Sequence, residues 1–209
     1  MTPLFKGEAD SSARLRPVGM AGAGWDIRKM CLCFFFAMWY AFTKGGMDML
    51  LYHGSTELVG RPEIRRGQVF LDFGTGFYTT TSFAQAERWA KIKMRRQNTD
   101  IGYVSVYEFD FEAARETLSV NRFEQADAQW LHFVAGNRRG EAMDAVWDLS
   151  IGPVADDNVY QTIRLFETGA YDAEYTVRRL KTEVLHDQWT FHTDAALRQL
   201  RFVKAKEIR

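Results

Sequence analysis

Three short segments of the chain carry residue types that could hold a nucleotide. They are Y-H-G-S at residues 52–55, G-F-Y-T-T at 76–80 and D-Q-W-T-F-H-T at 187–193. His53 and Tyr78 each lie at or near the end of a short apolar run, among glycines and small hydroxyl residues. Because glycine lets the backbone approach a ligand closely, this pattern predicts a nucleotide pocket lined partly by backbone.

The three segments resemble the His–Tyr–Glu type of ADP-ribosyltransferase, the group that contains the poly(ADP-ribose) polymerases. They are more closely similar to a bacterial domain-of-unknown-function family placed in that superfamily. The similarity covers roughly residues 47–208 and rests on L-Y-H-G-S, D-F-G-T-G-F-Y-T-T, G-P-V-A-D-D and Q-W-T-F-H-T. It implies an α+β fold with a split sheet and flanking helices, and NAD as the substrate.

The resemblance also implies how the site would hold NAD. Nicotinamide is a cationic leaving group, so the site must fix the ring and the ribose and stabilise an oxocarbenium-like transition state. An aromatic sandwich suits the flat ring: Tyr78 matches the stacking tyrosine, and Trp89, eleven positions later, matches the second face. His53 matches the histidine that bonds the adenosine ribose. Gly54 matches the glycine whose backbone holds the carboxamide, and Ser55 completes the NAD-binding set.

Two positions depart from the family pattern. Gln188 stands where the motif usually has glutamate, and an amide can bond a ribose hydroxyl but cannot act as a base. We therefore expect mono-ADP-ribosyl transfer or NAD hydrolysis, without polymer formation. Ala86 stands where the polymerases often have a serine that bonds the carboxamide, so that contact is missing or comes from Ser82 or Gln85.

Each of these residues also has a purely structural interpretation. A histidine before a glycine turn is often a half-buried turn residue, and Tyr78 and Trp89 could be core aromatics. Gln188 could be an exposed residue at a strand edge. Residues 152–157 (G-P-V-A-D-D) could form a turn followed by a helix cap, or a loop near the pocket that binds substrate or a partner.

The composition limits the classes of function. The chain has 209 residues, 46% of them hydrophobic, and no formal net charge. These values predict one globular domain, or one domain plus an appendage, without a global field for nucleic acid or lipid. His186 and His192 flank Gln188 without a carboxylate at metal-ligand spacing, so no metal site is expected. Cys31 and Cys33 support neither a zinc site nor a disulfide framework, which favours the cytoplasm; secretion as an effector stays open.

A basic segment lies within the helix expected after Ser82. Three uses of it stay open: a solvated face, a contact to the NAD diphosphate, or a contact to nucleic acid. Arginines between His53 and Tyr78 could add to either contact. The basic residues of the helix are Arg88, Lys91, Lys93, Arg95 and Arg96, and the arginines before Tyr78 are Arg61, Arg65 and Arg66.

Residues 1–46 differ from the rest of the chain. They show no periodicity, and their apolar run, residues 31–42, is too short for a membrane span, which needs roughly 20 residues. This part could lie outside the folded domain, even upstream of a true start at Met47, or form a poorly ordered apolar or signal-like segment, or pack as a helix. We expect the folded domain at 47–209, without a membrane-spanning segment.

From Met47 onward, periodicity and turn residues predict alternating strands and helices without a doubly wound parallel sheet. Ser82 and Gln85 form a capping-box pattern, S-x-x-Q, at the first helix. Gly136 and Gly169 are expected to end two later helices. Strands are expected at 49–55, 69–80, 101–110, 145–154, 188–193 and 201–208, and helices after 82 and at 123–136, 156–169, 173–184 and 194–200.

These observations support three hypotheses of function. The first is an ADP-ribosyltransferase-like enzyme, of the bacterial toxin or effector type, that modifies an unknown protein or nucleic-acid acceptor and has an antitoxin or immunity partner. The second is a catalytically weak NAD- or ADP-ribose-binding interaction module, suggested by Gln188. The third is a nucleic-acid-binding protein that uses the basic helix, against which the balanced charge argues.

Overall fold

The computed structural model of the protein describes residues 48–65, 71–154, 157–180 and 185–209. All of these ranges belong to one compact unit, Gly45–Arg209. The predictions made for residues 1–46, including Cys31 and Cys33, fall outside the described ranges.

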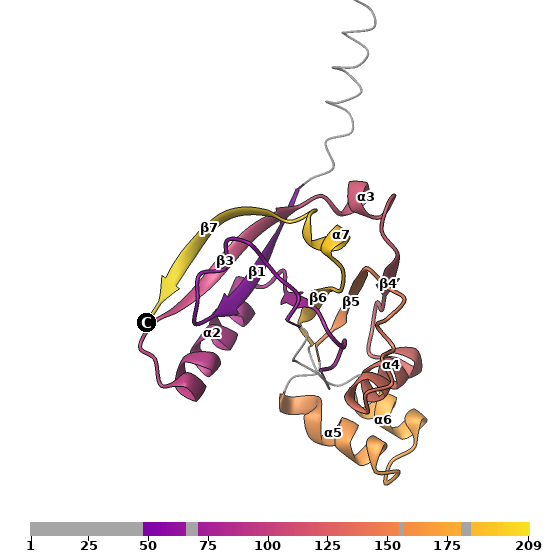
Figure 1. Cartoon of the computed structure of the whole chain (residues 1–209). Helices are drawn as coiled ribbons and strands as arrows, with labels where there is room; N and C mark the ends of the chain where they lie inside the picture. Colours follow the sequence, from indigo (N-terminus) through magenta and orange to yellow (C-terminus); the bar gives the residue numbers. More distant parts are fainter. Residues whose placement is uncertain (1–47, 66–70, 155–156, 181–184) are drawn as a thin grey trace, which may run out of the picture. The chain divides into compact units, whose positions relative to one another are not determined.

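The first sheet is antiparallel, with strand order β1-β3-β7 (Figure 1). It contains β1 (Met49–Ser55), β3 (Gly102–Phe109) and β7 (Arg201–Ile208). Helix α2 (Phe83–Gln97) packs along one face of this sheet. A small cluster built on Ala86, Ala90 and Val104 fills the contact, so α2 is fixed directly against the strand that carries His53.

The second sheet has the order β2-β6-β5-β4 and is mixed. Its strands are antiparallel except for the parallel pair β4–β5. They are β2 (Phe77–Thr79), β6 (Asp187–Phe191), β5 (Leu149–Pro153) and β4 (Val120–Arg122). Three helices group together beside this sheet in Figure 1, namely α4 (Ala128–Arg138), α5 (Asp157–Glu167) and α6 (Ala173–Leu180).

In the described part of the chain, a backbone bridge between Tyr52 and Thr80 joins the two sheets. The Tyr52 amide donates to the Thr80 carbonyl at 2.8 Å, and the Thr80 amide donates back to the Tyr52 carbonyl at 3.0 Å. This bridge holds the end of β1 beside β2, and β2 pairs in turn with β6. The three sequence segments singled out above are therefore neighbours in space.

Strand alternation gives the second sheet two different faces. On one face, apolar side chains pack against the first sheet in a core that includes Leu51, Phe77, Tyr107 and Phe191. On the other face, polar residues of β5 and β6 are buried, including Ser150, which is fully buried. The second face is where Tyr78 and Gln188 stand.

The predicted α+β class is confirmed, with six helices in the described residues. Short helices α3 (Phe111–Ala114) and α7 (Asp194–Leu197) complete the set, and α3 and β4 were not expected. Among the residues described, no helix is long and apolar enough to cross a membrane.

Two helix boundaries were predicted correctly and one was wrong. The Ser82 side chain caps α2 by accepting a bond from the backbone N–H of Gln85. Gly169, at φ 75°, follows the end of α5. The second bond of the capping box, from the Ser82 backbone amide to the Gln85 side chain, does not form. The Gln85 side chain accepts a bond from the Thr80 hydroxyl instead. Gly136 was expected to end its helix, but α4 runs through it to Arg138.

Candidate functional site

The three residues of the expected triad come from three strands that meet at the Tyr52–Thr80 bridge. His53 lies in β1, Tyr78 in β2 and Gln188 in β6. The His53 ring contacts β2 directly, with Nδ1 2.6 Å from the Tyr78 carbonyl oxygen. Tyr78 pairs with Thr190, two residues from Gln188, which places the Tyr78 and Gln188 Cα atoms within about 10 Å of each other.

His53 is held as a neutral imidazole. Burial, with smaller effects from Lys93 and Arg65, lowers the pKa of His53 to about 3. Its ring stacks on Phe77 with centroids 4.4 Å apart. A carbonyl can only accept, so Nδ1 must carry the proton, and Nε2 presents a lone pair that could accept a bond from a ligand hydroxyl.

The buried neutral histidine predicts acid sensitivity. Its folded pKa lies below its unfolded value, so its contribution to stability is complete above about pH 6.5 and is lost as the pH falls toward 3. Between pH 7 and pH 4.5 this costs about 2–3 kcal/mol. In His53→Asn the side-chain amide can still donate to the Tyr78 carbonyl but does not titrate, so urea unfolding at the two pH values should show a smaller acid loss than in the wild type. His192, whose pKa burial also lowers, should keep its own share of the loss; an identical acid loss in both proteins would contradict this account of His53.

Gly54 lies where β1 and α2 approach each other closely. A Cβ atom at this position would lie 1.9 Å from the Ala86 carbonyl oxygen, so no larger residue fits without movement of the backbone. The Gly54 carbonyl already accepts a bond of 2.9 Å from the Lys93 ammonium. The backbone group that the resemblance assigned to the nicotinamide carboxamide is thus occupied by a side chain of α2.

Tyr78 and Trp89 are not in ring contact. The Tyr78 hydroxyl donates to the Gly74 carbonyl at 2.6 Å and accepts from the Phe73 amide at 3.2 Å, and its ring packs against the cluster around Trp130. Trp89 lies half-buried on α2, the helix that packs against the other sheet. Tyr78 therefore also fixes a glycine turn, and the aromatic sandwich stays a prediction.

Gln188 is not the exposed strand-edge residue that one interpretation of the sequence expected. It lies in β6 between β2 and β5 and is only 5% exposed. Its cross-strand partner in β5 is Gly152, which has no side chain to bond it. The Gln188 Nε2 atom is buried without a hydrogen-bond partner, a state that costs about 1–3 kcal/mol and that a ligand oxygen would relieve.

Asp187, the neighbouring carboxylate, has a structural task. Its oxygens accept bonds from the side chains of Thr80, Thr81 and Trp189, at 3.0, 2.9 and 2.6 Å. These bonds tie β6 to the end of β2 beside the bridge between the sheets. The carboxylate is therefore not free to take the role that glutamate has in the related motif.

His192 supports the glycine turn through its ring nitrogens. Its Nδ1 lies 2.7 Å from the Thr75 carbonyl oxygen and its Nε2 lies 2.9 Å from the Ser150 hydroxyl. The described part of the chain contains no group of three or more potential metal ligands.

Gln85 and Ser82, the two proposed substitutes for the missing serine, are engaged with Thr80 and with the cap of α2.

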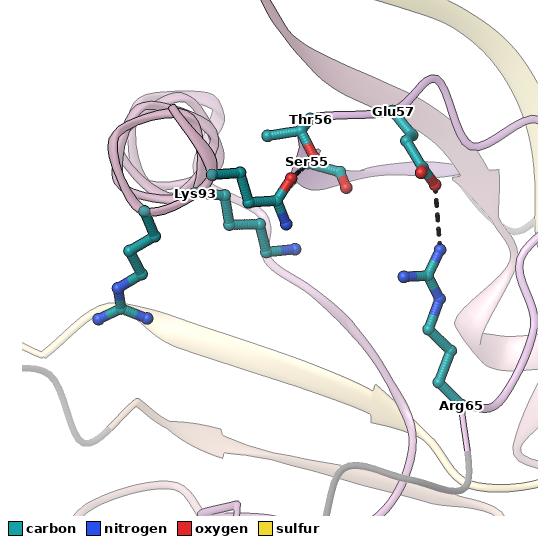
Figure 2. A pocket seen from close by; sticks show the side chains of 7 residues that line it. Ser55, Thr56, Glu57, Arg65 and Lys93 are labelled. Atoms are coloured by element: carbon teal, nitrogen blue, oxygen red, sulfur yellow. Dashed lines mark hydrogen bonds and ion pairs between the residues drawn. The ribbon is translucent and has the colours of Figure 1, made fainter. Parts of the chain in front are cut away.

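A basic pocket opens directly beyond the Y-H-G-S segment (Figure 2). Its volume is about 250 Å³, and it lies between the end of β1, the last turns of α2 and Arg65. The basic residues were noted in the sequence, but their convergence beside β1 depends on how α2 packs and could not be predicted from spacing. The lining residues are Ser55, Thr56, Glu57, Arg65, Lys93, Arg96 and Gln97.

A known family matches most of the chain. The family described as "Protein of unknown function (DUF3990)" matches residues 49–202. This range contains β1, β2 and β6 and therefore all three residues of the expected triad. No curated protein matches the chain.

Proposed function

The chain belongs to the DUF3990 family, whose function is unknown, and we propose that it is an NAD-dependent ADP-ribosyltransferase-like protein. In this proposal the two sheets form the split sheet of that fold, with the NAD site where β1, β2 and β6 meet. The activity is transfer of one ADP-ribose to a macromolecular acceptor, or to water, in a bacterial toxin or effector setting.

One observation carries the proposal. His53, Tyr78 and Gln188 are 135 residues apart at the extremes (53 to 188), yet they stand on three strands joined by the Tyr52–Thr80 bridge and the β2–β6 pairing. The neutral His53 ring and the unpartnered Gln188 amide supply an acceptor and a donor for hydroxyl groups. Each of these groups can bond a hydroxyl of a ribose-containing ligand.

The proposed reaction needs no proton from the protein at the bond that breaks. The bond between C1 of the ribose and the nicotinamide nitrogen breaks, its electron pair leaves with nicotinamide, and an acceptor oxygen or nitrogen bonds to C1. Gln188 cannot take up the acceptor's proton, so that proton leaves to solvent. Without a general base, a factor of roughly 10²–10⁴ in rate is absent, which favours slow single transfer over polymer synthesis.

A binding module without turnover is the second candidate. The observations that favour it are the buried position of Gln188 and the Lys93 bond on the Gly54 carbonyl. The Gln188 amide would have to become accessible, and the Gly54 carbonyl would have to exchange its bond with Lys93, before a substrate could use them. Such a protein would bind NAD or ADP-ribose and act through protein contacts.

The test uses NAD labelled in its adenosine half, incubated with the protein and a cell extract. The proposal predicts label on a protein or nucleic acid as single ADP-ribose units, or labelled free ADP-ribose, together with released nicotinamide. Binding of NAD by calorimetry without any product would support the binding module instead. Absence of both binding and product would reject both candidates.

A further inference from the structure

The basic pocket beside β1 has the size of one chemical group of a larger ligand. Sites that hold whole small molecules usually measure roughly 300–1,000 Å³, and this pocket measures about 250 Å³. It begins two residues after His53, at Ser55. A ligand that contacts His53 could therefore extend one group into the pocket.

The charge of the pocket selects an anion. Three cations, Lys93, Arg96 and Arg65, line it together with one carboxylate, Glu57. Figure 2 shows Lys93 and Arg65 reaching from separate segments toward the space beside Ser55 and Glu57. Arg96 has no hydrogen bond or ion pair with any residue that the structure describes.

Lys93 is already fixed in position. Its ammonium donates one of its three hydrogens to the Gly54 carbonyl at 2.9 Å, which leaves two donors for a ligand. Burial lowers the pKa of Lys93 to about 8, with a smaller contribution from the nearby Arg65. Glu57 partly offsets this lowering of the pKa. At pH 7 the side chain is mostly protonated, and an anion bound beside it would keep it so at higher pH.

The one carboxylate that lines the pocket can be displaced at a small cost in free energy. Glu57 pairs with Arg65 at 3.1 Å, but the two side chains are 70% and 68% exposed. Exposed pairs of this kind contribute only about 0–1 kcal/mol. A diphosphate or a phosphate monoester carries about two negative charges and has more acceptor oxygens than a carboxylate, so it can replace Glu57 as the partner of Arg65.

We infer that this pocket is a phosphate subsite of the ligand site, in which Lys93, Arg96 and Arg65 bind a phosphate group of the nucleotide. The inference rests on the proposed function for the identity of the ligand as a dinucleotide. The chemistry is that of a phosphate ester, which in NAD is the diphosphate and in NADP is also the 2′-phosphate. Lys93 is then a specificity-determining residue that links this phosphate to the backbone at Gly54.

The test compares Lys93→Met with the matched control Lys91→Met in calorimetric titrations. Lys91 lies on the same helix and pairs with Glu87, so the control removes the same charge outside the pocket. The probes are NAD, NADP, ADP-ribose, inorganic pyrophosphate and nicotinamide riboside, which has no phosphate. Lys93→Met should weaken the phosphate-containing probes roughly tenfold to a hundredfold, while Lys91→Met changes them less than about twofold.

The probes also separate the source of the phosphate. An equal loss for NAD and NADP in Lys93→Met assigns the diphosphate to the pocket, and a larger loss for NADP assigns the 2′-phosphate. If pyrophosphate binds to the wild type and not to Lys93→Met, the pocket is a phosphate site, whether or not NAD is bound or cleaved. If NAD is neither bound nor cleaved in that case, only the proposed function fails. NAD binding that is unchanged in Lys93→Met overturns the pocket and leaves the proposed function standing.

Two further measurements guard against a folding artefact. Arg96→Gln changes an exposed residue, so it offers a second test of the pocket should Lys93→Met fail to fold. Lys93→Arg should retain binding at pH 9, where the wild type weakens because Lys93 of the free protein has lost its proton and must regain it when the anion binds. Unchanged wild-type affinity between pH 7 and pH 9, or tighter binding of a DNA or RNA oligonucleotide than of any dinucleotide, would overturn the inference.

Discussion

Gln188→Ala is expected to lower the rate of nicotinamide release from NAD roughly tenfold to a hundredfold. The amide of Gln188 is buried, and its Nε2 has no partner in the described structure, so in the proposed site it bonds a ribose hydroxyl. A bond to a charged transition state contributes about 1.5–3 kcal/mol, which converts to that loss in rate. If the bond strengthens in the transition state, kcat should fall more than KM rises. Steady-state kinetics with NAD measures both constants.

Two variants make this prediction specific. Gln188→Glu restores the residue usual in the related motif and should maintain or raise turnover. Gln199→Ala removes an exposed glutamine outside the site and should leave turnover unchanged. Thermal unfolding of each variant separates a catalytic loss from a folding defect. Wild-type turnover in a folded Gln188→Ala protein would remove Gln188 from the proposed site.

Gly54→Ala is expected to destabilise the fold by more than about 3 kcal/mol. The added Cβ would lie 1.9 Å from the Ala86 carbonyl oxygen and 2.9 Å from the Ala90 nitrogen. Both atoms belong to the backbone of α2 and cannot move aside as a flexible side chain would, so the cost should exceed the usual range for overpacking. In a domain of this size the loss lowers Tm by at least about 6–12 °C.

Gly60→Ala is the matched control. A Cβ atom there would meet only Leu58 Cδ2, at 3.8 Å, an ordinary van der Waals distance. Its Tm should stay within a few degrees of the wild type, since a surface change usually alters stability by less than about 0.5 kcal/mol. Equal stability of the Gly54→Ala and wild-type proteins in calorimetric scans would contradict the packing described for β1 and α2.

Local sequence patterns were sufficient to predict most of the helices and strands. The helix after Ser82 and the strand–helix–strand sequence at the C-terminal end follow from caps and periodicity, and the structure has them as α2, β6, α7 and β7. Two errors came from local rules that tertiary contacts overrode. The first was Gly136, which stays helical. The second was Gln85, whose side chain is drawn to Thr80 rather than to the cap.

The site was only partly predictable, because its geometry depends on which faces the strands present. The sequence identified His53 and Tyr78 as neighbours of glycine turns, but it did not show that the His53 ring would bond the Tyr78 carbonyl. It also left Gln188 as a possible edge residue, because β6 becomes a central strand only when β5 pairs with it. The Lys93 bond to Gly54 depends on the packing of α2, which no motif specifies.

The rate of nicotinamide release from NAD by the wild-type protein tests the central claim most directly. Chromatography of the reaction over time, with and without a cell extract, measures this rate against a protein-free control. We predict nicotinamide release above the control, at a lower rate in a folded His53→Ala protein. Release no faster than the control under both conditions would contradict the claim that the meeting point of β1, β2 and β6 cleaves NAD.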